Sequence, residues 1–280
     1  MRSDVVSHAR PSRHSAEMLE HELDLAREVQ ESLFPANIPA LPGIRVAALN
    51  QPARIVSGDL YDIIALDDHR MVVVCADVSG KGVPAALLAA QVQSYFRAMV
   101  LAAAVIRSAL ASASVSVDVL GSLGSLPLHV VSQLNAIACR RAGLLGRYAT
   151  LFFAEIDAKD GTVHYVNAGH NPPLLLARGS VVELLSAGGP PVGLLPEATY
   201  EAGRATVPAG GTLLIYTDGV IEARDRHDEE FGLPRLIDLC TADRGGVEQL
   251  LPRILEAVET WRDGLESGDD ITLVAVGRDR

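Results

Sequence analysis

The sequence predicts an α+β protein, a layered sandwich of two mainly antiparallel sheets flanked by helices. Strand-like and helix-like segments come in blocks along the chain, without the strict β–α–β alternation of a Rossmann sheet. The strand-like runs are short and rich in Val and Ile, whereas the helical stretches are longer. The 280 residues, 49% of them hydrophobic, suffice for one large domain with a full core or for two small ones.

The first 34 residues precede the main domain, which we expect at 35–280. Residues 1–14 are polar, contain proline and show no period, which predicts a disordered tail. Over 15–34 apolar residues recur at helical spacing up to Pro35, which predicts an amphipathic helix with its stripe at Leu19, Leu23, Ala26 and Leu33. Two fates of this stripe remain open: packing on its own domain, or pairing with a second copy in a homodimer.

The elements of the main domain are predicted from hydrophobic period and turn residues. In the first half we expect strands at 44–50, 60–66 and 71–76, with a turn at 67–70. Gly82 and Pro84 open a helix from Ala85 to near Ala104, and 107–126 is expected to be a flexible connection. In the second half we expect a helix at 128–142, a hairpin of 148–156 and 162–168, strands at 172–177, 181–185 and 212–217, helices at 234–241 and 247–261, and a closing strand at 271–276.

Composition narrows the functional classes. The formal net charge of -11 argues against nucleic acid as the main ligand, because phosphate backbones are bound through basic patches. The N-terminus lacks the apolar core of a signal peptide, and we find no uninterrupted apolar run of about 20 residues, so we expect a cytoplasmic protein without a membrane segment. The three cysteines, Cys75, Cys139 and Cys240, are far apart and predict neither a disulfide framework nor a zinc site.

Four aspartate-containing segments stand at the ends of apolar strands. They are Ser57-Gly58-Asp59, Asp77-Val78-Ser79-Gly80, Thr217-Asp218-Gly219 and Gly268-Asp269-Asp270. Any one of them alone is most often a turn. A hairpin of the second and third strands, centred near Asp68, sets Asp59 opposite Val78 and beside Asp77, and antiparallel pairing of 212–217 with 271–276 brings Asp218 to Asp269. Carboxylates this close repel each other unless a cation neutralises them.

An all-carboxylate cluster suits hard divalent cations such as Mg²⁺ and Mn²⁺. Two such ions can share a water molecule, lower its pKa and direct it in line at phosphorus. A covalent nucleophile is then unnecessary.

A series of blocks from Ala26 to Gly277 resembles the bacterial SpoIIE-type branch of the metal-dependent protein phosphatases (PPM), relatives of protein phosphatase type 2C. In order, the blocks are AREVQESLFPANIPALPG, PARIVSGDLYD, ADVSGKGVPAALLAA, RYATLFFAEID, VNAGHNPPLLL, GGPPVGLL, IYTDGVIEARD, EEFG and GDDITLVAV. The resemblance implies an αββα sandwich. It also implies an enzyme that dephosphorylates phosphoserine or phosphothreonine, commonly on STAS-like anti-sigma-factor antagonists that govern stress and developmental transcription.

The resemblance also assigns roles to residues. It implies that Asp77 bridges two metal ions, that Asp59 and the backbone carbonyl of Val78 complete one ion's protein ligands, and that Asp218 and Asp269 hold the other. Asp270 is the adjacent candidate, although the family pattern favours Asp269. Ser57 stands where this branch usually has glycine.

Several residues and functions keep two interpretations. Asp62 either accepts a hydrogen bond from a metal-bound water or is a strand residue, and His170 either orients a loop near substrate or is a turn residue. Lys81 could meet phosphate, but the pattern GxxxxGK[ST] is absent, which excludes a P-loop. Gly80 and Gly82 are expected to let the backbone approach the metal and lead into the helix. Besides the metal-dependent phosphatase, the alternatives are a catalytically weak protein that sequesters a phosphorylated partner and a small-molecule phosphohydrolase.

Overall fold

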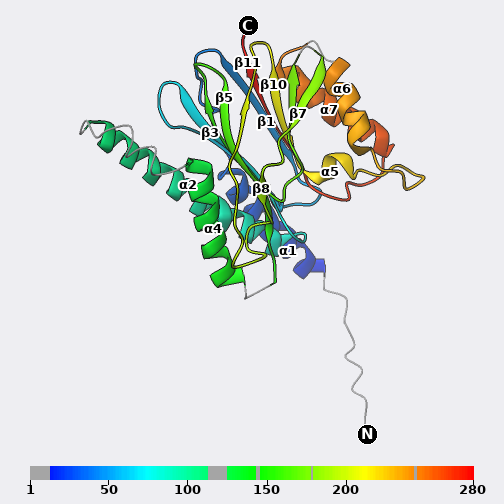
Figure 1. The fold of residues 1–280 in the computed structure, drawn as a ribbon. Helices are drawn as coiled ribbons and strands as arrows, with labels where there is room; N and C mark the ends of the chain where they lie inside the picture. Colours follow the sequence, from blue (N-terminus) through cyan, green and yellow to red (C-terminus); the bar gives the residue numbers. More distant parts are fainter. Residues whose placement is uncertain (1–12, 113–124, 143–145, 178, 243–244) are drawn as a thin grey trace.

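The computed structural model describes residues 13–112, 125–142, 146–177, 179–242 and 245–280, with a sandwich of two sheets at its centre (Figure 1). Nearly all of the predicted tail at 1–14, and residues 113–124 of the predicted connection, lie outside the described residues. The N-terminal helix, α1, spans Arg13–Glu31 and ends three residues earlier than predicted.

Both sheets are mainly antiparallel, as predicted. The first has the order β1-β11-β10-β6-β7 and consists of β1 (Ile44–Gln51), β6 (Leu174–Ala177), β7 (Ser180–Leu184), β10 (Thr212–Tyr216) and β11 (Ile271–Arg278). The second has the order β2-β3-β4-β5-β8 and consists of β2 (Asp59–Ala65), β3 (Arg70–Val78), β4 (Ala149–Asp157), β5 (Thr162–Ala168) and β8 (Gly188–Gly189), while β9 (Gly203–Thr206) also pairs with β5. Within the described residues, the pairing of β5 with β8 is the parallel one. The short strands β8 and β9 were not predicted.

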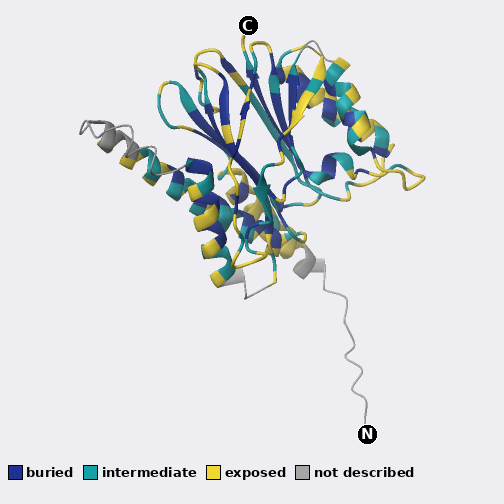
Figure 2. Cartoon of the chain, in the orientation of Figure 1, coloured by how far each residue is buried: buried dark blue, intermediate teal, exposed yellow. Residues whose placement is uncertain are grey.

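Helices cover the outer face of each sheet (Figure 1). The helices α2 (Val83–Ser112) and α4 (Leu126–Ala142) cover the second sheet, whereas α6 (Gly232–Ala242) and α7 (Val247–Arg262) cover the first. Alternation along the strands separates three apolar layers: in β3, Val72 and Val74 face α2, and Val73 and Cys75 face the other sheet. The sequence of β3 is a nearly continuous apolar run, as expected for a strand that is buried on both faces (Figure 2).

The helix α2 is longer than predicted and continues through residues expected to be a flexible connection. The small and apolar residues of 105–112 carry no helix breaker, which explains the error. By length and composition the segment Val83–Ile106 is apolar enough to cross a membrane. The face of α2 that carries Ala85, Phe96 and Val100 is buried against the second sheet.

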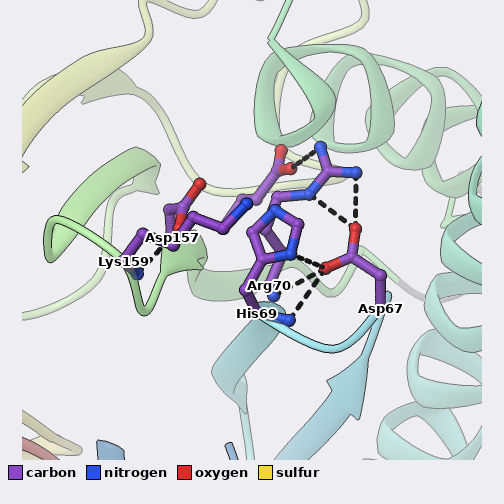
Figure 3. A network of polar contacts seen from close by, with 6 residues as sticks. Asp67, His69, Arg70, Asp157 and Lys159 are labelled. Carbon is purple, nitrogen blue, oxygen red and sulfur yellow. Dashed lines mark hydrogen bonds and ion pairs between the residues drawn. The ribbon is translucent and has the colours of Figure 1, made fainter. Parts of the chain in front are cut away.

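The hairpin between β2 and β3 corrects the predicted register by one residue. Asp59 lies directly opposite Asp77, not Val78, because Leu66 still bonds to Arg70 and the turn is reduced to the three residues 67–69, where four were predicted. The Asp67 carboxylate accepts hydrogen bonds from the backbone N–H groups of His69 and Arg70, at 3.1 and 2.8 Å, and pairs with the Arg70 guanidinium (Figure 3). Arg70 therefore belongs to β3 and not to the turn, which shifts the pairing.

Candidate functional site

The predicted residues Asp59 and Asp77 lie at one end of the layer between the two sheets. Asp59, Asp77 and Thr150 form a cross-strand row on neighbouring strands β2, β3 and β4. Two residues away along the same strands, Cys75 and Phe152 occupy the same face and are buried in the inter-sheet core. The carboxylates therefore continue the apolar layer at its rim.

Asp59 is the more deeply buried of the pair, with 2% of its surface exposed. Its Oδ2 accepts a hydrogen bond of 2.8 Å from the Thr217 hydroxyl, which comes from the opposite sheet. Burial, and secondarily the negative charge of Asp77, raise the pKa of Asp59 well above its ordinary value. The pair is therefore a site where negative charge is costly without a counter-ion.

A network of hydrogen bonds among hydroxyl, amide and backbone N–H groups holds Asp59 in place. The Thr217 hydroxyl also accepts from the backbone N–H of Thr272 at 2.9 Å, and the Thr272 hydroxyl accepts from the Asn50 amide at 2.8 Å. The Ser57 hydroxyl accepts from the backbone N–H of Asp59 at 3.0 Å. Ser57, at the position where the family resemblance implies glycine, is fully buried. Its hydrogen bond to the N–H of Asp59 fixes the start of β2.

Asp218 and Asp269 come from the other sheet. Asp218 begins α5 (Asp218–Ile221) directly after β10, and Asp269 lies just before β11, which pairs antiparallel with β10 as predicted. Burial, then Glu222 and Asp269, raise the pKa of Asp218 to about 6. Burial, then Asp218, Asp269 and Asp270, raise the pKa of Asp77 to about 7, so the charges of these three carboxylates act on Asp77.

Asp270 contacts the backbone that precedes Asp59. Its two carboxylate oxygens accept hydrogen bonds from the backbone N–H groups of Ala53 at 2.7 Å and Gly58 at 2.6 Å. The Gly58 carbonyl in turn accepts from the N–H of Val78 at 3.2 Å. Asp270 therefore ties the loop before β2 to the start of β11, whereas Asp269 forms an ion pair with Lys81.

Two further residues with open interpretations are buried. The His170 Nδ1 lies 2.9 Å from the hydroxyl of Thr150, the residue opposite Asp77, and burial lowers the pKa of His170 to about 4. Asp62 is fully buried in β2, 3.5 Å from the Arg97 guanidinium of α2. Burial raises the pKa of Asp62 despite this partner.

Gln30 is a site residue that the sequence reasoning missed. Its side-chain amide donates to the Ser57 carbonyl at 2.6 Å and accepts from the Ser57 N–H at 2.8 Å, so α1 holds the loop next to Asp59. The signal was present in the sequence: Gln30 occupies the position between Ala26 and Leu33 in the predicted apolar stripe. A polar residue in such a stripe indicates a specific buried partner.

The donor atoms suit hard divalent cations. Asp59, Asp77, Asp218 and Asp269 offer carboxylate oxygens, and their mutual repulsion favours a bound positive charge. Among the residues that the structure describes, no three His, Cys, Asp or Glu side chains converge into a ready-made metal site. The chemistry of the donor set fits Mg²⁺ or Mn²⁺.

The raised pKa of Asp77 predicts an unusual pH dependence of stability. A carboxyl group whose folded pKa is raised stabilises the fold when protonated, and this stabilisation is lost as the pH rises through about 7. In EDTA, the melting temperature is expected to rise as the pH falls from above 7 towards 5, with Asp77 contributing on the order of 3 kcal/mol. Calorimetry should show this, and Asp77→Asn should flatten the profile. An unchanged profile in the variant would contradict the assignment.

Comparisons with known proteins agree with these observations. The sequence profile described as Stage II sporulation protein E (SpoIIE) matches residues 67–279. Protein IcfG of Synechocystis sp. is 33% identical over 264 residues, which cover 92% of this chain and 41% of that protein. Phosphoserine phosphatase RsbP of Bacillus subtilis is 28% identical over 72% of this chain and 45% of its own, so the chain spans less than half of either protein. Phosphoserine phosphatase RsbU of Bacillus subtilis is 23% identical, over 93% of this chain and 71% of RsbU.

Solved structures share the fold. The SiaA-PP2C domain of Pseudomonas aeruginosa superposes with a TM-score of 0.76 at 17% identity, over 95% of this chain and 99% of that one. The RsbU and RsbW domains of Rv1364c from Mycobacterium tuberculosis superpose with a TM-score of 0.67 at 26% identity, over 87% of this chain and 64% of that one. The likeness to the SiaA domain concerns the fold alone.

Proposed function

Because this chain belongs to the family described as Stage II sporulation protein E, we propose that it is a metal-dependent serine/threonine protein phosphatase. The observation that carries the proposal is the position of Asp59 directly opposite Asp77, within electrostatic reach of Asp218 and Asp269. The curated relatives called phosphoserine phosphatases support the same reaction class.

In this proposal each acidic residue has a distinct role. Asp77 would help to hold both cations, Asp59 and the Val78 carbonyl would hold one of them, and Asp218 and Asp269 would hold the other. We propose Asp269 as the direct ligand in preference to Asp270, because Asp270 accepts two short hydrogen bonds from backbone N–H groups, at 2.7 and 2.6 Å. Asp269 accepts one backbone N–H at 3.1 Å and otherwise pairs with the half-exposed Lys81. Bound Mn²⁺ or Mg²⁺ would supply an activated water molecule and neutralise phosphoryl charge.

The remaining residues keep these carboxylates in position. Thr217 donates a hydrogen bond to Asp59 from the opposite sheet, and Ser57 holds the backbone of Asp59. These contacts hold the Asp59 carboxylate and its backbone in one orientation. Orienting groups before the reaction lowers the entropic part of the barrier.

The proposed substrate is a phosphorylated, STAS-like anti-sigma-factor antagonist in the cytoplasm. The family membership supports this substrate class, and the net charge of -11 disfavours a nucleic-acid substrate. Regulation of a sigma factor in stress would follow from removal of the phosphate.

Metal depletion tests the reaction. After treatment with EDTA and desalting, the protein should not release phosphate from phosphorylated antagonists of its own cell, and added Mn²⁺ or Mg²⁺ should restore release. Turnover of many substrate molecules per protein molecule distinguishes catalysis from sequestration. Faster hydrolysis of free phosphoserine than of phosphoprotein would instead indicate a small-molecule phosphohydrolase. Full activity in EDTA would contradict the metal mechanism.

We also propose that α1 pairs with a second copy of the chain. Leu19 of the predicted stripe is 56% exposed. Outside that stripe Met18, Leu25 and Val29, at spacings of seven and four, are exposed at 54%, 47% and 64%. Sedimentation should therefore give a dimer for the full chain and a monomer for the double variant Leu25→Glu/Val29→Glu, which leaves Gln30 in place. A monomeric wild-type chain would refute the pairing.

A further inference from the structure

Lys81 contacts the acidic residues from the turn between β3 and α2. Its Nζ lies 2.7 Å from Oδ2 of Asp269 and also donates a hydrogen bond to the carbonyl oxygen of Gly268. About half of the Lys81 side chain remains exposed, at 49%. The Lys81 side chain is thus partly accessible to solvent, and its ammonium group can leave Asp269 without disturbing the buried core.

The charge of Lys81 acts on more than one carboxylate. It lowers the pKa of Asp77 and of Asp218, against burial and neighbouring carboxylates, which raise both. One ammonium group therefore offsets negative charge that comes from both sheets.

The choice of lysine at this position is unusual for this chain. Of its 24 basic Lys and Arg residues, only Lys81 and Lys159 are lysines. An ammonium group is a compact point charge, whereas a guanidinium group is a planar fork with fixed donor directions. The two atoms that Lys81 contacts, a carboxylate oxygen and a backbone carbonyl oxygen, belong to the ligand class that Mg²⁺ and Mn²⁺ also prefer.

We propose that Lys81 competes with a divalent cation for Asp269, so that its ammonium group limits metal affinity and metal binding releases its side chain. This inference rests on the proposed metal-dependent function. An ammonium ion and a divalent cation repel each other, and Oδ1 of Asp269 already accepts the N–H of Asp270 at 3.1 Å, so the cation competes with Lys81 for Oδ2. The protein must therefore give up the Lys81–Asp269 ion pair when the ion binds to Asp269.

Titration calorimetry with Mn²⁺ tests the competition in the full-length protein. Lys81→Met keeps the length of the side chain and removes its charge, so we expect its Kd for Mn²⁺ to be about tenfold lower than that of the wild type. Lys81→Arg keeps the charge and should stay close to the wild type. Lys159→Met is the matched control, because Lys159 is exposed in the turn between β4 and β5, at the other end of the second sheet, and should leave the Kd unchanged (Figure 3).

The direction in which Lys81→Met changes the Kd for Mn²⁺ shows whether Lys81 competes with the cation or only supports the structure. A lysine that only stabilised the turn would, when replaced, weaken metal binding. Tighter binding in Lys81→Met is expected only when the ammonium group opposes the cation.

Acylation of amines in the wild-type protein provides a second measurement that needs no variant. Mass spectrometry compares the labelling of Lys81 with that of Lys159, which serves as the internal reference. We expect Mn²⁺ to raise the Lys81-to-Lys159 ratio, because the ion frees the Lys81 ammonium group from Asp269.

Two results would overturn the inference: a Kd in Lys81→Met that is equal to or higher than that of the wild type, or a labelling ratio that saturating Mn²⁺ leaves unchanged. Either could occur while the wild type binds Mn²⁺ and turns over substrate, and the proposed function would then stand. Failure of the wild type to bind Mn²⁺ would overturn both together.

Discussion

Asp77→Asn is expected to reduce metal-dependent phosphatase activity by about 10³-fold or more, the scale on which removal of one electrostatic group from an active site acts. Asp77 is the carboxylate on which the charges of Asp218, Asp269 and Asp270 act together, and it is the proposed bridge between the two ions. Asparagine keeps the shape and removes the negative charge. Phosphate release from a phosphoprotein under saturating Mn²⁺ measures the loss.

The fold should survive this substitution. Removing a carboxylate from a group of repelling carboxylates relieves strain in the metal-free protein, so the melting temperature in EDTA should stay constant or rise above neutral pH. Asp68→Asn is the matched control, because Asp68 is exposed in the loop at the other end of the same hairpin and should retain full activity. Wild-type activity in Asp77→Asn would refute the site.

Gly219→Ala is expected to lower activity by about 10²-fold, since displacement of reacting groups by about 1 Å costs this much. A Cβ atom at Gly219 would overlap the carbonyl oxygen of Asp270 and lie 3.4 Å from the carbonyl carbon of Asp269. These are backbone atoms, so the segment before β11 must shift. We expect Asp269 to move away from Asp218 and the free energy of unfolding to fall by about 1–3 kcal/mol.

Gly268→Ala is the matched control for this prediction. Gly268 precedes Asp269 directly, but a Cβ atom there meets open space. Activity and urea denaturation should therefore be near wild type in Gly268→Ala and reduced in Gly219→Ala. Equal behaviour of the two variants would show that close packing at Gly219 does not position the acidic residues.

Much of the fold could be predicted because the strands carry their own evidence. The apolar runs in β3 and β4 are long enough to mark the position and the burial of these strands. The comparisons confirm the resemblance to the SpoIIE-type phosphatases. The one-residue error in the β2–β3 register came from Arg70, whose side chain bonds to Asp67 in the turn although its backbone is in the strand. Apolar periodicity does not reveal such a polar contact.

The contacts between distant segments were not predictable from the sequence. Asp269 and Asp270 are neighbours of identical chemistry, and only tertiary structure shows that Asp270 accepts the N–H groups of Ala53 and Gly58 while Asp269 pairs with Lys81. The position of Gln30 in the apolar stripe pointed to a buried partner, but the sequence did not show that this partner is Ser57, 27 residues away. The roles of the four aspartates as metal ligands remain predictions.

The contact of Gln30 with Ser57 connects α1 to the strands β2 and β3. The helix and the strands are expected to differ in how readily they unfold locally. The strand β3, which carries Asp77 next to its last residue, is buried on both faces, whereas most side chains of α1 are exposed. Amide hydrogens should therefore exchange with solvent slowly in β3 and fast in α1. Asp59 lies between these extremes, because it pairs with β3 on one side and depends on α1 through Ser57 on the other. Fraying of a helix at the edge of the molecule can thus loosen one carboxylate of the site while its neighbour stays rigid.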